Sequence, residues 1–166
     1  MAESKYETTP RYWITTASPT IGGVVNPLTA ACTEAGYVPS IVRILDNPGV
    51  REDSKQAADI IREVILAHDA DEPTIEFVTI DSERDFEAIV EFHRDAIEEA
   101  TETEAPIAID VTPGRKFMSA IAFQAGIQFG ADHVYYLYLH SSNYYDRVYP
   151  DLPRPGVDLV DFTEVF

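Results

Sequence analysis

Short apolar segments alternate with segments of helical periodicity along most of this sequence. The apolar segments predict β-strands at residues 12–17, 37–45, 74–80, 106–111 and 133–139. The segments between them, whose apolar residues recur every three or four positions, predict helices at residues 26–36, 54–68, 85–101 and 116–129. Parallel strands need long crossover connections, which helices supply. The alternation therefore predicts an α/β fold with an open, mainly parallel sheet and helices on both faces.

Two further patterns complete the predicted fold. Asn26 is expected as the N-cap of the first helix, with Pro27 at its first helical position and Gly36 as its stop. The sequence VDLVDFTEVF at residues 157–166 predicts one more strand at a sheet edge. We expect residues 1–166 to form a single Rossmann-like domain of five to six strands. Its core spans about residues 12–139, and residues 140–166 are a C-terminal edge segment.

The charge of the chain limits what it can bind. It carries 29 Asp plus Glu against 12 Lys plus Arg, which gives a formal net charge of -17 and a sequence pI of about 4.4. Lysine is scarce against arginine, a composition that resembles proteins from the high-salt cytoplasm of halophilic archaea, whose carboxylate surface keeps them hydrated. No basic face is available for duplex DNA or RNA, so a bound anion must be small and held by local geometry.

Other features point to a soluble protein without a cofactor. A single cysteine, Cys32, excludes an intramolecular disulfide and a cysteine-based metal site. No apolar run is long enough to span a membrane, and the start MAESKYETTPRYW lacks the apolar core of a signal peptide. The dinucleotide pattern G-x-G-x-x-G and the triphosphate pattern G-x-x-x-x-G-K-[ST] are both absent. We therefore expect a cytoplasmic protein with no cofactor and no metal ion.

Two loops have the chemistry to bind an anion. In open α/β sheets, ligands bind beyond the carboxyl ends of the strands. The loops after the first and fourth predicted strands both precede helices, whose N-terminal N–H groups favour negative charge. They offer hydroxyl groups, glycines and a basic pair, at Ser18, Thr20, Gly22, Gly23, Thr112, Gly114, Arg115, Lys116 and Ser119.

The second of these loops carries a family resemblance. The sequence DVTPGRKFMS, from Asp110 to Ser119, resembles the motif after the fourth strand of CRISPR-associated Rossmann-fold (CARF) domains, most often Thr-Gly-Gly-Thr-Lys. The pair Asn26-Pro27 after the first strand is also similar to that family. The departures are Pro113 in place of glycine, which removes a backbone donor, and Arg115 in place of threonine, which adds a cation.

The resemblance implies a homodimer that binds a cyclic oligoadenylate across its two-fold axis. The implied ligand-facing residues are Ser18, Thr20, Asn26, Thr112, Pro113, Gly114, Arg115, Lys116 and Ser119. Asp110 is a further candidate: it could orient Lys116 or a ribose hydroxyl, or it could pin the turn through its own carboxylate.

The resemblance also implies an enzyme of the ring-nuclease type, which opens the messenger without a metal ion. In that hypothesis Lys116 stabilises the developing charge, Arg115 assists, and Ser18 or Thr20 positions the ribose. The alternatives are a non-catalytic sensor or sponge of the same messenger, and an unrelated nucleotide-binding α/β protein.

Several other residues admit two interpretations. His93 lies on an apolar helix stripe and is expected to be packed and hydrogen-bonded rather than functional. His140, at the ligand edge of the fifth strand, suits acid–base chemistry, capping or solvent exposure. The tyrosines of VYYLYL and NYYDRVY could stack on adenines, although packing is the more common role for tyrosine in a strand.

Overall fold

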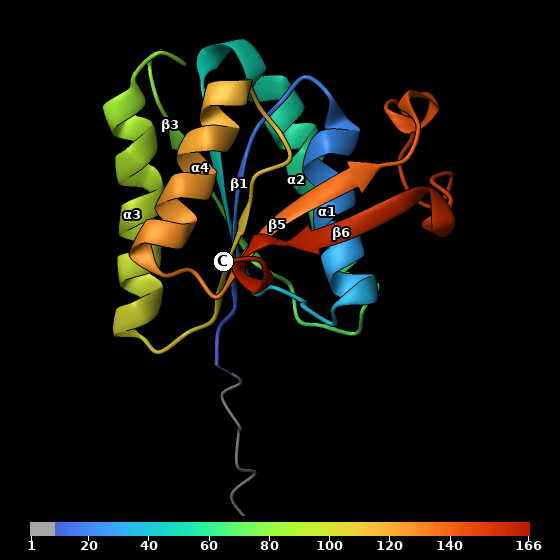
Figure 1. Ribbon diagram of the computed structural model, residues 1–166, viewed down its shortest axis with the longest axis horizontal. Helices are drawn as coiled ribbons and strands as arrows, with labels where there is room; N and C mark the ends of the chain where they lie inside the picture. Colours follow the sequence, from blue (N-terminus) through green and yellow to red (C-terminus); the bar gives the residue numbers. More distant parts are fainter. Residues whose placement is uncertain (1–8) are drawn as a thin grey trace, which may run out of the picture.

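The computed structural model describes residues 9–166, so most of the segment inspected for a signal peptide lies outside the described residues. The chain forms one sheet with the strand order β3-β2-β1-β4-β5-β6 (Figure 1). The strands are β1 (Tyr12–Thr16), β2 (Ile41–Asp46), β3 (Thr74–Thr79), β4 (Ile107–Asp110), β5 (His133–Leu139) and β6 (Val157–Asp161). The α-helices are α1 (Ile21–Glu34), α2 (Arg51–Leu66), α3 (Phe86–Glu102) and α4 (Lys116–Phe129). The predicted α/β class is confirmed.

Strand pairing is parallel from β3 through to β5, and only β6 runs antiparallel to its neighbour β5. The predicted C-terminal edge strand is therefore confirmed as β6. From β1 the chain first adds strands on one side, through β2 to β3, and then returns to add β4, β5 and β6 on the other. The strand order thus reverses between β1 and β4, where the connections after these two strands diverge.

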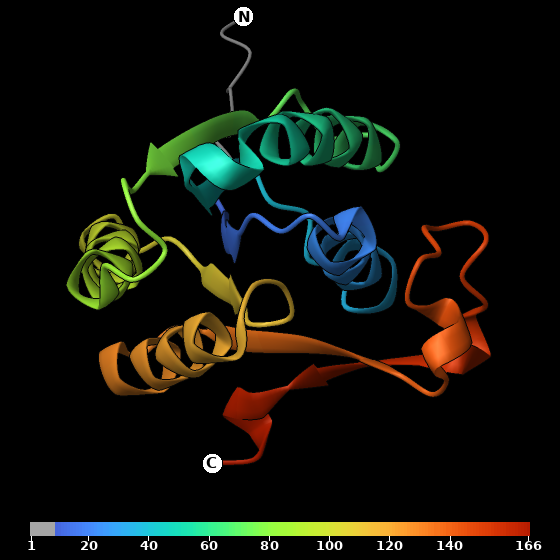
Figure 2. The same ribbon diagram turned by 90° about the horizontal axis from the view of Figure 1, so that it is seen from above.

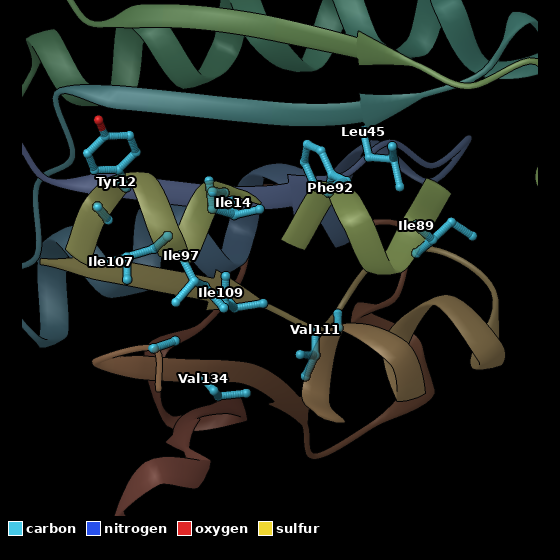
Figure 3. Packing of buried hydrophobic residues seen from close by; sticks show 14 of the residues in the cluster. Tyr12, Ile14, Leu45, Ile89, Phe92, Ile97, Ile107, Ile109, Val111 and Val134 are labelled. Carbon is cyan, nitrogen blue, oxygen red and sulfur yellow. The ribbon is translucent and has the colours of Figure 1, made fainter. Parts of the chain in front are cut away.

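Helices cover both faces of the sheet. Figure 2 shows α1 and α2 on one face and α3 and α4 on the other. The strand β1 is buried on both faces: Trp13 packs in the cluster under α1 and α2, whereas Tyr12 and Ile14 pack under α3 and α4. Figure 3 shows the second cluster, in which Ile14 and Ile109 of the sheet meet α3 side chains such as Ile97. A strand buried on both faces explains the unbroken apolar runs in the sequence.

The bounds of α4 and β5 agree with the sequence-based expectation, but the start of the first helix was wrong. Helix α1 begins at Ile21, with Thr20 as its N-cap, so Asn26 and Pro27 lie inside it. An interior proline costs a helix roughly 3 kcal/mol. Val24 and Val25 are fully buried, and burying each contributes about 1.5 kcal/mol or more. Burial of the preceding apolar residues therefore offsets the proline and extends the helix toward β1.

His93 on α3 is packed, as expected, but it is not hydrogen-bonded as expected. Its side chain is fully buried, and neither ring nitrogen has a hydrogen-bond partner within residues 9–166. Its ring lies edge-on to Phe92, with centroids 5.0 Å apart. Burial without a partner disfavours the charged form, which lowers the pKa of His93 to about 4. His93 therefore behaves as a neutral core side chain.

Within residues 9–166, no helix is both long and apolar enough to cross a membrane.

The substitution His93→Leu tests this description of the core. The unfolded chain binds a proton at this histidine below its ordinary pKa of 6.5, whereas the folded chain binds it only below about 4. The wild type should therefore lose up to about 3 kcal/mol of unfolding free energy relative to His93→Leu as the pH falls from 6.5 to 4. Urea unfolding of both proteins across this range measures the difference. A difference independent of pH would contradict the proposed burial.

Candidate functional site

A pocket of about 380 Å³ opens beside the carboxyl ends of β1, β4 and β5. Its volume lies within the roughly 300–1,000 Å³ typical of small-molecule sites. Three parts of the chain form its walls: the loop that leads into α1, the turn that leads into α4, and the end of β5 with the residues that follow. The lining residues are Ser18, Thr20, Gly22, Gly23, Asn26, Thr112, Pro113, Gly114, Tyr136, Leu137, Tyr138, Leu139, Ser141, Ser142 and Tyr145.

The walls of this pocket are uncharged. Every lining residue among those described is a glycine, a proline, a hydroxyl-bearing or amide side chain, or a leucine. The chain as a whole has a net charge of -17. The pocket therefore offers neutral donors and aromatic rings to a ligand and is free of the carboxylates that dominate the composition.

The two helices that begin beside the pocket have unusual N-termini for this chain. Neither α1 nor α4 has an acidic residue in its first turn or a side-chain cap. By contrast, α2 carries Glu52 and Asp53 in its first turn, and α3 carries Glu87 and is capped by Asp85. The first N–H groups of a helix lack intrahelical partners and carry partial positive charge. The starts of α1 and α4 therefore suit a bound anion.

The loop before α1 brings two predicted residues to the pocket. Ser18 and Thr20 both line it, and the Ser18 hydroxyl accepts a hydrogen bond from the Thr20 backbone N–H at 3.2 Å. The Thr20 hydroxyl lies 3.2 Å from the Tyr145 hydroxyl across the pocket. The hydroxyls of Ser18 and Thr20 therefore both lie at the pocket surface.

The turn before α4 depends on a glycine and a buried carboxylate. Gly114 has φ +93, and an added Cβ would lie 3.2 Å from Met118 Sδ and 3.3 Å from Thr16 Cγ2. Beneath the turn, Asp110 accepts hydrogen bonds from the Thr15 hydroxyl at 2.9 Å and from the Thr112 N–H at 3.0 Å. Asp110 is 1% exposed and does not line the pocket. Of its two possible roles, the geometry supports pinning the turn.

The basic pair that follows Gly114 lies outside the pocket. Arg115 points toward the loop before α3, where its Nε lies 2.8 Å from Glu83 Oε2. Lys116 and Ser119 line an adjoining groove along α4, together with Phe123, Tyr136 and Phe162 among others. The Ser119 hydroxyl donates to the Pro113 carbonyl at 3.4 Å. The described fold thus gathers the neutral predicted residues other than Ser119 into one pocket and leaves Ser119 and the two cations on its outer side.

Asn26 lines the pocket, but its amide is already occupied. Its side chain is 3% exposed, its Nδ2 donates to the Arg147 carbonyl at 2.8 Å, and its Oδ1 accepts from the Tyr149 N–H at 3.3 Å. The expectation that Asn26 caps α1 was wrong. Its side chain instead holds the segment after β5 against α1.

Sequence analysis named the tyrosines of the third wall as possible stacking partners for adenine, but it did not include this wall in the predicted site. Ser141, Ser142 and Tyr145 follow β5 and face the loop before α1, and Tyr138 of β5 joins them. The sequence signal was the polar stretch HSSN at the ligand edge of the sheet. No local pattern could predict that the chain would fold back over α1 here, because the contacts join residues more than a hundred positions apart.

Other chemistry-bearing residues do not join the pocket. His140 does not line it, and its Nε2 pairs instead with Asp158 at 2.8 Å on an exposed surface. Within residues 9–166, no group of three or more His, Cys, Asp or Glu side chains is arranged to hold a metal ion. The pocket therefore depends on hydrogen-bond donors, aromatic rings and helix N-termini.

The substitution Asp110→Asn tests the buried carboxylate beneath the turn. Burial raises the pKa of Asp110 from its ordinary 3.8 to about 7. The folded chain therefore keeps the proton that the unfolded chain has lost, and the stability linked to it disappears as the pH rises through 7. Relative to Asp110→Asn, the wild type should lose up to about 4 kcal/mol of unfolding free energy between pH 4 and pH 7. Denaturant titrations across this range give the difference, and parallel curves would refute the raised pKa.

Two solved structures resemble this chain in fold. Csm6 from Enterococcus italicus, solved with bound cyclic hexa-2′-fluoro-hexa-dAMP, superposes with a TM-score of 0.57 and 18% identity, over 83% of this chain and 35% of that chain. A type III CRISPR defence DNA nuclease activated by cyclic oligoadenylate gives a TM-score of 0.53 and 18% identity, over 80% of this chain and 19% of that chain. This chain thus spans about a third or less of either protein. A search of curated protein sequences finds no significant match.

A family model identifies the chain directly. The model of the CRISPR-associated protein NE0113 family matches residues 34–154, which is well over half of the sequence. The matched span runs from the end of α1 to the segment that forms the third wall of the pocket. The resemblance to CARF domains stated from the sequence is confirmed for family and fold. This chain belongs to the CRISPR-associated NE0113 family and has the fold of the CARF-domain proteins.

Proposed function

We propose that this protein binds a cyclic oligoadenylate in the pocket beside β1, β4 and β5. The observation that carries the proposal is the uncharged pocket between two helix N-termini that are free of acidic residues. Its position at the reversal of strand order is where α/β sheets bind nucleotides. The ligand class follows from the family and from the cyclic oligoadenylates that bind to or activate proteins of the same fold.

The chemistry of the pocket suits each part of such a ligand. A phosphodiester anion can accept hydrogen bonds from backbone N–H groups at the starts of α1 and α4. Ribose hydroxyls can pair with the hydroxyls of Ser18 and Thr20, and adenine rings can pack on tyrosines such as Tyr138. No basic surface is needed, because the ligand is small and its charges are few.

We propose that the protein acts as a homodimer whose interface includes α4 and the neighbouring face of β5. The groove along this face contains Ala120, Phe123 and Phe162, and it shares Thr112, Gly114 and Tyr136 with the pocket. Tyr138 on β5 is 51% exposed. A two-fold axis here would set two pockets side by side and match the symmetry of a cyclic ligand.

Ring cleavage is the second proposed activity, with Lys116 as the residue that stabilises charge. The ribose 2′-hydroxyl gives up its proton to water as its oxygen attacks the adjacent phosphorus, the bond to the 5′-oxygen breaks, and that oxygen takes up a proton from water. The product is linear and ends in a 2′,3′-cyclic phosphate. Ser18 is placed to orient the ribose, and Arg115 could assist after leaving Glu83. Binding is the better supported activity, because within residues 9–166 no titratable group other than tyrosine lines the pocket.

A pair of glycine substitutions tests binding at this site. Gly114 and Gly130 stand at opposite ends of α4, and both have positive φ, so replacement by alanine strains each backbone by roughly 1–2 kcal/mol. Only Gly114 lines the pocket, and only there would the new Cβ meet Met118 and Thr16. Calorimetric titration with cyclic tetra- and hexa-adenylate should show about tenfold or greater loss of affinity in Gly114→Ala and little change in Gly130→Ala. Equal affinity in both variants would place the ligand elsewhere, and no binding of either ring by the wild type would refute the proposed function.

Two single lysine substitutions, Lys116→Ala and its control Lys55→Ala, test cleavage separately from binding. The wild type is incubated with each ring in high salt and with a chelator, and the products are separated by chromatography. Lys116→Ala should lose most of the linear product because the charge-stabilising ammonium is gone. Lys55→Ala removes an exposed lysine on α2, paired with Glu52, and should cleave as the wild type does. Tight binding with the intact ring recovered from wild type would identify a sensor or sponge.

A further inference from the structure

The segment between β5 and β6 is fixed onto helix α1 at several points. It comprises residues 140–156 and projects from the sheet beside α1 (Figure 1, orange to red). Leu152 is 1% exposed and packs in a small cluster with Ala30 of α1 and Leu137 of β5. This apolar contact secures the far end of the segment.

A second attachment lies close to the pocket. The buried amide of Asn26 binds the backbone at Arg147 and Tyr149, so one side chain holds both ends of a short turn. One helical turn earlier, a Cβ at Gly22 would come within 3.0 Å of the Arg147 carbonyl oxygen. In α1, Asn26 thus provides hydrogen bonds to this part of the segment, and Gly22 leaves space for its backbone.

These attachments place Tyr145 at the mouth of the pocket. Its side chain lines the pocket and is 57% exposed, and its hydroxyl lies 3.2 Å from the Thr20 hydroxyl on the opposite wall. An aromatic ring with a free face suits stacking against a nucleobase, which contributes to binding regardless of base identity. The hydroxyl contact with Thr20 fixes the edge of the ring rather than its face.

We propose that Tyr145 stacks on a base of the bound nucleotide and that Asn26 is a positioning residue which acts through the 145–149 backbone. This inference rests on the proposed function and deepens it, because it assigns the segment after β5 a direct part in recognition. In this proposal Asn26 affects binding through the backbone that its amide holds.

The Tyr145 substitutions test the stacking contact. In calorimetric titrations of the full chain with cyclic tetra- and hexa-adenylate, Tyr145→Ala should bind about tenfold or more weakly. Tyr145→Phe keeps the ring and should stay within about threefold of the wild type. Phe77→Ala, which removes a comparably exposed ring from β3 on the far side of the sheet, serves as the control and should bind normally. Because Tyr145 is exposed, its variants should keep the thermal midpoint of the wild type.

A double-mutant cycle tests the positioning role. Asn26→Asp keeps an acceptor for the Tyr149 N–H but turns a carboxylate oxygen toward the Arg147 carbonyl, so the turn should shift. The single variant should weaken binding severalfold, and in the Tyr145→Ala background it should weaken binding no further. A general structural defect would instead lower affinity by the same factor in both backgrounds.

The outcomes separate this inference from the function on which it rests. If the wild type binds a ring and Tyr145→Ala binds it equally well, the stacking role is overturned and the proposed function stands. If the wild type binds neither ring, both are overturned. Loss of affinity in Tyr145→Ala with retention in Tyr145→Phe supports the assignment.

Discussion

The parallel pairing of β1 with β4 determines where this protein can bind a ligand. Because strand order reverses at this pair, the chain leaves β1 and β4 toward opposite faces of the sheet, into α1 and α4. The two helix N-termini therefore meet beside one opening. Asp110 ties the strand ends together by accepting hydrogen bonds from Thr15 of β1 and from Thr112 beyond β4. The topology of the sheet therefore determines the position of the pocket. The sheet itself is formed by buried strands, which appear in the sequence as apolar runs.

Two buried titratable groups affect stability in opposite directions as the pH changes. The buried His93 makes the fold more stable as the pH rises from 4 to 6.5, whereas Asp110 makes it less stable between 4 and 7. The two contributions oppose each other over the pH range that they share. If the unfolding free energy of the wild type does not change with pH, the opposing contributions of His93 and Asp110 can still be present. The single variants separate them.

The sequence was sufficient for the elements whose patterns are local. The bounds of α4 and β5 and the edge strand β6 follow from periodicity, glycine placement and sheet topology, which also bring most of the neutral residues of the two predicted loops to one pocket. Prediction failed where tertiary contacts overrule local rules. Pro27 normally marks a helix start, but burial of Val24 and Val25 places it inside α1. Asn26 looks like a cap, but its partners lie more than a hundred residues away.

The position of the basic pair follows from the composition of the chain. With 29 acidic residues against 12 basic ones, a cation placed near an anion site has carboxylates close by to pair with, as Arg115 does with Glu83. Such a pair must break before the cation can serve a ligand, which reduces the gain from binding. Backbone N–H groups and hydroxyls carry no net charge, so neighbouring carboxylates do not neutralise them, and their fixed geometry needs little reorganisation. In a chain of this composition, neutral donors at acid-free helix N-termini are the more dependable means of holding a small polyanion.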